Sequence, residues 1–238
     1  MKLDILAIGA HPDDVELSCA ATLAKEISLG KKVGILDLTR GELGTRGSAE
    51  IRDIEAANAA KILGIEIREN LAFADGFFVN DKKHQLEVIK IIRKYKPQIV
   101  LCNAVNDRHI DHPKGSKLVS DACFLSGLVK IETELNGKKQ DAWRPKQVYH
   151  YIQWNNLDPD FVVDVSGFME IKLKAIKAYS SQFYDPNSTE PSSPISDKNF
   201  LNSIKFRGQD LGRLVGTEFA EGFTTERYVA IKSLDNLF

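Results

Sequence analysis

The chain has 238 residues, of which 43% are hydrophobic and 27% charged, and its formal net charge is -1. This length and composition are enough to bury one sizeable core, so we expect a single domain spanning residues 1–238. The near-zero net charge gives no indication of a nucleic-acid or anionic-membrane partner, and no apolar run approaches the about 20 residues of a membrane span, so we expect a cytoplasmic protein.

Strand and helix signals alternate along the chain. Short apolar runs are typical of buried strands, and longer segments carry apolar residues at helical spacing. The opening run is short, contains Asp4 and leads into a polar motif, which indicates a strand and not a secretory signal. In chain order we predict a strand at 3–8, a helix at 15–29, a strand at 33–38, a helix at 49–63, a strand at 65–71, a helix at 85–95, a strand at 99–102, a helix at 113–128, strands at 147–152 and 161–165, and a helix at 168–180.

This alternation predicts an α/β, Rossmann-like fold with a mostly parallel sheet flanked by helices. Ligands of such sheets bind outside the carboxyl ends of the strands, so polar clusters that directly follow the first and fourth strands should meet in one pocket. Residues 185–197 are rich in Pro and Ser and predict an exposed loop. That loop is either a plain surface connection or a lid over the pocket.

The three cysteines are Cys19, Cys102 and Cys123, and no two of them have Cys-x-x-Cys spacing. An odd count without metal-site or redox-motif spacing favours buried, reduced thiols in a reducing compartment.

Two polar clusters occupy the positions that the predicted sheet marks for a site. The first, His11-Pro12-Asp13-Asp14, directly follows the first strand, and the second, Asp107-Arg108-His109-Ile110-Asp111-His112, lies between the fourth strand and a helix. An ordinary helix cap needs only one such carboxylate, and the adjacent Asp13 and Asp14 repel each other unless a cation is near. Three of the five histidines fall in these clusters. A structural reading, with capped loops and surface histidines, stays open for each motif alone.

Together the clusters supply the ligands of a catalytic zinc site, which usually has three protein ligands and one position for water. His11, Asp14 and His112 are the candidate metal ligands. Asp13 remains beside the water as the candidate general base. His109, if protonated, would stabilise the developing oxyanion, and Asp111 would orient an imidazole.

The segment Gly9-Ala10-His11-Pro12-Asp13-Asp14-Val15-Glu16 and the second cluster resemble the two motifs of the LmbE-like (PIG-L) zinc deacetylases. The resemblance extends along nearly the whole chain, through Asp37-Leu38-Thr39-Arg40-Gly41-Glu42, Arg52-Asp53-Ile54-Glu55-Ala56, Tyr95-Lys96-Pro97, Tyr179-Ser180-Ser181-Gln182-Phe183 and Ala220-Glu221-Gly222-Phe223. Within that family the chain is most similar to the deacetylases of bacillithiol biosynthesis, which hydrolyse N-acetylglucosaminyl-malate to glucosaminyl-malate and acetate.

The resemblance implies one Zn²⁺ per subunit held by His11, Asp14 and His112, with Asp13 as general base and His109 as the polarising or acid residue. It also implies that Arg52 and Arg108 face the malate carboxylates, for which the planar guanidinium is suited; a surface salt bridge is the alternative role for each. The family further implies a homo-oligomer, a hexamer or a trimer.

Two other hypotheses stay open. The same metal chemistry can act on another N-acetylglucosamine compound, such as a thiol conjugate, a chitooligosaccharide or a lipid-linked sugar. Alternatively, the chain is a non-catalytic Rossmann-like module that binds a sugar or nucleotide, although the first turn lacks Gly-x-Gly-x-x-Gly and no phosphate-binding P-loop is present.

Overall fold

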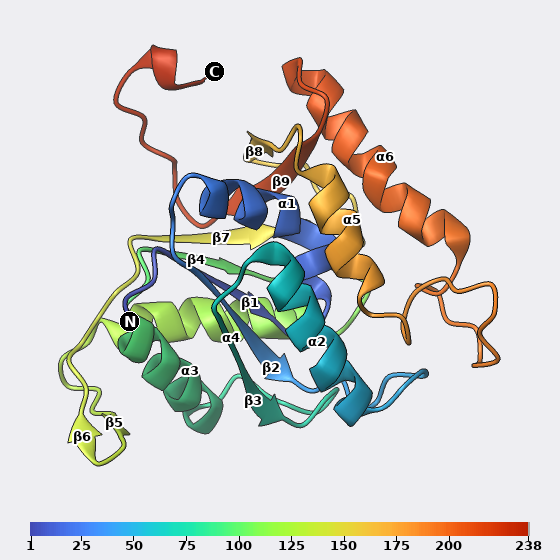
Figure 1. Ribbon diagram of the computed structural model, residues 1–238. Coiled ribbons are helices and arrows are strands. Elements are labelled where there is room, and N and C mark those ends of the chain that lie inside the picture. The colour runs from blue at the N-terminus through green and yellow to red at the C-terminus, as the bar shows by residue number, and fades with distance from the viewer. Residues whose placement is uncertain (238) are drawn as a thin grey trace.

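The computed structural model describes residues 1–237, and its centre is a seven-stranded sheet in the order β3-β2-β1-β4-β7-β9-β8 (Figure 1). Neighbours from β3 to β7 pair in parallel, while β9 is antiparallel to both β7 and β8. The prediction of a mostly parallel sheet is therefore confirmed. The strands are β1 (Ile5–Gly9), β2 (Val33–Thr39), β3 (Ile67–Phe73), β4 (Ile99–Cys102), β7 (Gln147–Tyr151), β8 (Phe161–Asp164) and β9 (Ala220–Thr225), and a separate hairpin joins β5 (Glu134–Leu135) to β6 (Lys138–Lys139).

Helices cover both faces of the sheet (Figure 1). One core lies between the sheet and α1, α2 and α5, and the other lies between the sheet and α3 and α4. Strand β1 contributes to both, because Ile5 and Ala7 point into the first core and Leu6 and Ile8 into the second. The helices are α1 (Asp14–Ser28), α2 (Ala49–Leu63), α3 (Lys82–Tyr95), α4 (Asp111–Ser126), α5 (Met169–Lys177) and α6 (Lys198–Val215), followed by the 3₁₀ turn η1 (Leu234–Leu237).

The strand order reverses between β1 and β4. From β1 the chain proceeds to β2 and β3 on one side, and it then returns to place β4 on the other side of β1. The helices that follow β1 and β4 therefore cover opposite faces of the sheet, which leaves a crevice at the carboxyl ends of these two strands. Both polar clusters of the sequence lie in these two loops.

Helix α6 and strand β9 were not predicted from the sequence, and the structure adds both. Helix α6 contains Gly208 and Gly212, which lower helix propensity. Each glycine allows close packing: a Cβ at Gly208 would lie 2.7 Å from Met169 Cε, and one at Gly212 would lie 2.7 Å from the carbonyl oxygen of Thr217. The contact with Met169 is long-range and the contact with Thr217 closes the end of the helix, and helix propensity includes neither. Helix α6 lies outside β9 and α5 (Figure 1).

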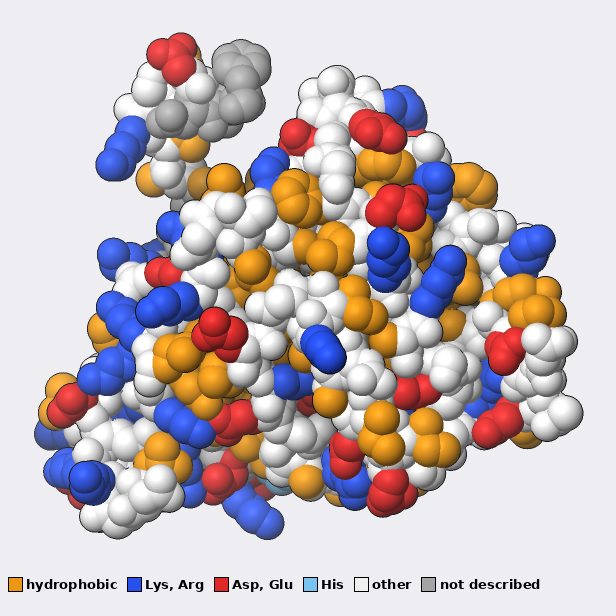
Figure 2. All heavy atoms as spheres, viewed as in Figure 1, with side chains coloured by type: hydrophobic (Ala, Val, Ile, Leu, Met, Phe, Trp, Pro, Cys, Tyr) orange, Lys and Arg blue, Asp and Glu red, His pale blue; other side chains and the backbone are white. Residues whose placement is uncertain are grey.

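Cys19, Cys102 and Cys123 are buried free thiols, as predicted. Within residues 1–237, no helix combines the length and the apolar character needed to cross a membrane. On the face shown in Figure 2, acidic and basic side chains are interspersed, in keeping with the net charge of -1.

Candidate active site

The first cluster forms the turn between β1 and α1. Gly9 ends the strand, and a Cβ there would lie 3.0 Å from the backbone oxygen of His11, so the tight turn favours glycine. Asp13 then adopts a left-handed backbone, with φ 108°. Such a conformation is costly for a residue with a side chain and is concentrated at functional sites. Asp14 begins α1, and both carboxylates of the turn are buried.

The second cluster brings two histidines onto this turn. His109 precedes α4, and His112 lies in its first turn. The ring centroids of His11 and His112 are 5.6 Å apart. Asp14 lies between the two rings, with its Oδ1 3.1 Å from His112 Nε2 and its Oδ2 3.6 Å from His11 Nδ1. The loops after β1 and β4 therefore converge as the sheet topology predicts.

Carboxylates hold the outer nitrogen of each imidazole. His112 Nδ1 lies 2.5 Å from Asp107 Oδ2, and His11 Nε2 lies 3.0 Å from Asp75 Oδ1 and 3.4 Å from Asp111 Oδ2. A carboxylate accepts a hydrogen bond from the ring N–H that it faces, so in each neutral ring the lone pair is on the nitrogen turned toward Asp14. Asp111 therefore lies beside the ring of His11, and its role as an orienting group stays a prediction.

This donor set fits a divalent metal ion. Two imidazole nitrogens face the carboxylate of Asp14, and imidazole and carboxylate are a common ligand set for a catalytic divalent ion. The two nitrogen–oxygen distances of 3.1 and 3.6 Å bracket the separation of about 3.3 Å expected between neighbouring ligands of tetrahedral zinc. The ligand atoms of His11, His109 and His112 also lie within 4.8 Å of one another, so His109 is at the same site.

The electrostatics of the site favour positive charge at the two rings. Burial lowers the pKa of His112, but Asp14 and Asp107 outweigh that effect and raise it to about 9. Burial likewise opposes protonation of His11, yet its carboxylate neighbours raise its pKa well above the usual value. His109 differs, because burial and the charges of His11 and His112 lower its pKa. The neighbouring carboxylates therefore favour a positive charge at His11 and His112 and not at His109.

Two amides hold the carboxylate of Asp14. Asn103, directly after β4, donates from Nδ2 to Asp14 Oδ2 at 2.9 Å, and Gln153, just after β7, donates from Nε2 to Asp14 Oδ1 at 3.0 Å. Asn103 also accepts from the backbone nitrogen of Ala10 at 2.9 Å. Three strands therefore position one carboxylate.

Asp13 is paired with Arg52, which lies in the first turns of α2. Arg52 Nη1 is 3.8 Å from Asp13 Oδ2, and both side chains are buried. The guanidinium also donates to Gln182 Oε1 and to the backbone oxygen of Pro12, and a side chain at Gly41 would collide with it. Burial raises the pKa of Asp13 to about 7, although the charge of Arg52 lowers it. Arg52 is thus held against the candidate base.

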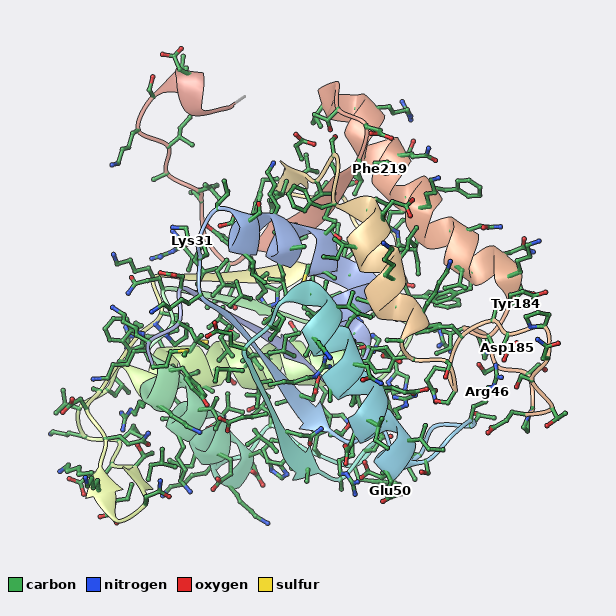
Figure 3. The ribbon with its side chains drawn as sticks, viewed as in Figure 1. Lys31, Arg46, Glu50, Tyr184, Asp185 and Phe219 are labelled. Atoms are coloured by element: carbon green, nitrogen blue, oxygen red, sulfur yellow. The ribbon has the colours of Figure 1, made fainter. Side chains whose placement is uncertain are left out.

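These side chains form the floor of a cleft with a volume of about 1020 Å³. Arg108 lies on its wall, where its guanidinium carbon is 4.5 Å from the centre of the Trp154 ring. Arg46 lies near Tyr184 and Asp185 at the start of the 185–197 loop (Figure 3), donates to Phe183 O and Ser188 Oγ, and also lines the cleft. The other lining side chains include Leu43, Ile110, Ile152, Leu157, Pro194, Ile195, Phe200, Ile204, Arg207 and Leu211.

Three polar groups of the site were not predicted from the sequence: Asp75, Asn103 and Gln153. Each follows the end of a parallel strand, β3, β4 or β7, within two residues. The rule that selected the two histidine clusters applies to them too. Each is a single polar residue with no histidine next to it in the sequence, so no metal-ligand motif pointed to it.

The comparisons with known proteins agree with this geometry. The family model described as PIG-L, GlcNAc-PI de-N-acetylase, matches residues 6–123. The diacetylchitobiose deacetylase of Thermococcus kodakarensis is 30% identical over 190 residues, which cover 75% of this chain and 70% of that protein. The chain belongs to the PIG-L family. It is therefore a hydrolytic N-deacetylase, an enzyme of the amide-hydrolase class.

Other relatives match in sequence or structure. The mycothiol S-conjugate amidase of Streptomyces coelicolor is 29% identical over 185 residues, covering 65% of this chain and 62% of that protein. The crystal structure of a conserved protein from Thermus thermophilus superposes with a TM-score of 0.87 at 33% identity, covering 98% of each chain. The PIG-L fold predicted from the sequence is thereby confirmed.

Proposed function

We propose that this PIG-L enzyme is a zinc-dependent deacetylase that hydrolyses the acetamide of N-acetylglucosaminyl-malate to glucosaminyl-malate and acetate, the deacetylation step of bacillithiol biosynthesis. The observation that carries the chemistry is the convergence of His11, Asp14 and His112 beside a separate buried carboxylate, that of Asp13. Relatives named as deacetylases of diacetylchitobiose and of a 2-acetamido-2-deoxy-glucopyranoside support an N-acetylglucosamine-type substrate.

His11, Asp14 and His112 would hold the zinc, in a site whose chemistry also accepts other divalent metals. When bound, zinc lowers the pKa of a water and polarises the amide carbonyl. The carboxylates Asp75, Asp107 and Asp111 keep both imidazoles oriented with their lone pairs inward.

Asp13 would act as general base and then as acid. Its carboxylate takes a proton from the attacking water and passes one to the amine that leaves, which maintains the proton balance of amide hydrolysis. Arg52 holds this carboxylate in place and favours its charged form. Asp13 directly precedes α1, and its side chain makes no capping hydrogen bond to that helix, so its carboxylate is not engaged as a cap.

His109 would donate a hydrogen bond to the oxygen of the amide carbonyl. Its ring stacks on His112 with centroids 5.0 Å apart and meets His11 edge-on at 4.6 Å. A neutral imidazole retains one N–H donor, so this role does not require protonation.

Metal analysis and product assays test the proposal together. We expect about one zinc per chain after purification and release of acetate from N-acetylglucosaminyl-malate that a chelator abolishes and zinc restores. N-acetylglucosamine and diacetylchitobiose should be assayed in parallel. If diacetylchitobiose were turned over faster than the malate conjugate, it would be the better candidate substrate. If none of the three compounds released acetate, the catalytic proposal would be contradicted.

A further inference from the structure

We propose that Arg207, on α6, forms a carboxylate-binding site with Arg108 beside Trp154 in the cleft, so that the enzyme selects amino-sugar conjugates whose aglycone carries carboxylates. We call this region, Trp154 with Arg108 and Arg207, the aglycone end. The inference rests on the proposed function for the identity of the sugar. It assigns the carboxylate contact to a residue that carries no motif in the sequence.

Both guanidinium groups contact Trp154, one at its ring and the other at its backbone oxygen. Arg108 stacks on the ring of Trp154 at 4.5 Å, and Arg207 Nη2 donates to the backbone oxygen of Trp154 at 2.8 Å. Both side chains line the cleft. Two cations from separate elements, the loop before α4 and helix α6, therefore face the same part of the cavity.

Neither cation forms a close ion pair with a carboxylate of residues 1–237. Among the side chains that the structure describes, no carboxylate lies within 4.0 Å of Arg108 or Arg207, whereas Arg213 on the same helix pairs with Asp210 at 2.7 Å. Asp158 and Asp210 are the acidic groups on this wall, and Asp210 is the one engaged by Arg213. A bound carboxylate would supply the missing charge.

The surroundings of Arg207 would strengthen such a pairing. Ile204 and Leu211, one helical turn before and after Arg207, also line the cleft. Burial lowers the pKa of Arg207 while Asp107 raises it, as expected for a guanidinium partly removed from water. A charge pair is stronger where water is displaced, and a guanidinium can donate two parallel hydrogen bonds to one carboxylate.

Arg52 is less suited to this contact than the resemblance implied. Its guanidinium already donates to Gln182 and to Pro12 O and lies against Asp13. Among the described residues, Arg207 makes one hydrogen bond, from Nη2 to Trp154 O. A guanidinium has five N–H donors, so Arg207 keeps donors for a ligand.

Calorimetric binding to the zinc-loaded full chain tests the inference. An Asp13→Asn background prevents hydrolysis, and the ligands are N-acetylglucosaminyl-malate and its dimethyl ester. We expect Arg207→Gln to weaken binding of the malate conjugate by about 10- to 100-fold, the loss typical of one charge-assisted contact, and to weaken binding of the ester much less. Arg207→Lys should restore part of the difference, because it keeps the charge without the planar fork.

Arg213→Gln is the matched control, since it removes an arginine of α6 that is already paired. It should leave the preference for the conjugate over the ester unchanged. Equal weakening of both ligands by Arg207→Gln would show that Arg207 only supports the wall of the cleft, and equal affinity of the parent protein for both would also overturn the inference. Acetate release is a separate readout, so a failure of the catalytic proposal leaves the binding result interpretable.

Discussion

Around His11 and His112, side chains from the loops after β3, β4 and β7 and from the start of α4 hold the two imidazoles and the carboxylate of Asp14. Around Trp154, the two guanidinium groups have no carboxylate within 4.0 Å among the described side chains. We call the first region, His11 with Asp14 and His112, the metal end. Both ends belong to one cleft. They differ in how many of their polar groups already have hydrogen-bond or ion-pair partners within the protein.

This difference suggests that the metal end carries out the reaction and that the aglycone end determines which substrate binds. At the metal end, buried groups are oriented before any substrate arrives, which removes reorganisation from the chemical step. At the aglycone end, partly exposed cations retain unused donors, so the ligand completes the arrangement. Substitutions at the metal end should therefore change metal content, turnover or stability, and substitutions at the aglycone end should change ligand preference.

The largest effect is expected from His112→Ala. It removes a candidate ligand, so zinc content should fall from about one per chain to a small fraction, and turnover should fall to the background rate. Metal analysis and acetate release measure both. His84→Ala is the control, because His84 pairs with Asp81 on α3 outside the cleft. Full zinc content in His112→Ala would remove this residue from the ligand set.

Asp13→Asn should leave zinc in place and lower kcat by about 10²- to 10⁴-fold, the usual contribution of a general base. Asparagine suits the test because it tolerates the left-handed backbone that Asp13 adopts at φ 108°. An acetate-release assay at saturating substrate, with metal analysis of the same sample, distinguishes loss of base from loss of metal. A kcat within a few-fold of the parent enzyme would show that another group takes the proton.

Asp107→Asn should weaken zinc binding by about 10- to 100-fold, as is typical when a carboxylate behind a metal-binding histidine is lost. Asp107 lies 2.5 Å from His112 Nδ1 and also accepts from the backbone nitrogen of Asn155 at 2.9 Å. Competition with a chelator measures the affinity. Asp121→Asn, at a carboxylate paired with Lys117 outside the cleft, is the control. Unchanged zinc affinity in Asp107→Asn would mean that His112 is oriented without it.

The sequence predicted the metal end better than the aglycone end for a physical reason. His11, Asp13, Asp14 and the second cluster are local motifs, and the strand–helix alternation places both at one edge of a parallel sheet. The two motifs converge because of the sheet topology, and that topology can be predicted from the periodic pattern of apolar residues. The assignment of individual roles to these residues remains a prediction that the variants above test.

The aglycone end depends on contacts that no local pattern contains. Arg207 lies on α6, whose interior glycines obscured the helix, and it reaches the cleft only because α6 packs along β9. Asn103 and Gln153 are single polar residues after strands, and their roles become visible only through the hydrogen bonds that join them to Asp14. Boundaries shifted for a similar reason: the third strand, predicted at 65–71, is Ile67–Phe73, in register with β2.

The smallest effects are expected in stability, and they compare the two ends directly. Asn103 is fully buried, and its Oδ1 accepts from Ala10 N while its Nδ2 donates to Asp14 and Gln153. Asn103→Ala leaves buried partners unsatisfied, so the free energy of unfolding should fall by about 1–3 kcal/mol. Arg108→Gln removes only an exposed stacking contact with Trp154, so its cost should be about 0.5–1 kcal/mol. Urea unfolding of both variants and the parent enzyme measures the contrast. A larger loss in Arg108→Gln than in Asn103→Ala would contradict it, because the aglycone end would then be as fully built by the protein as the metal end.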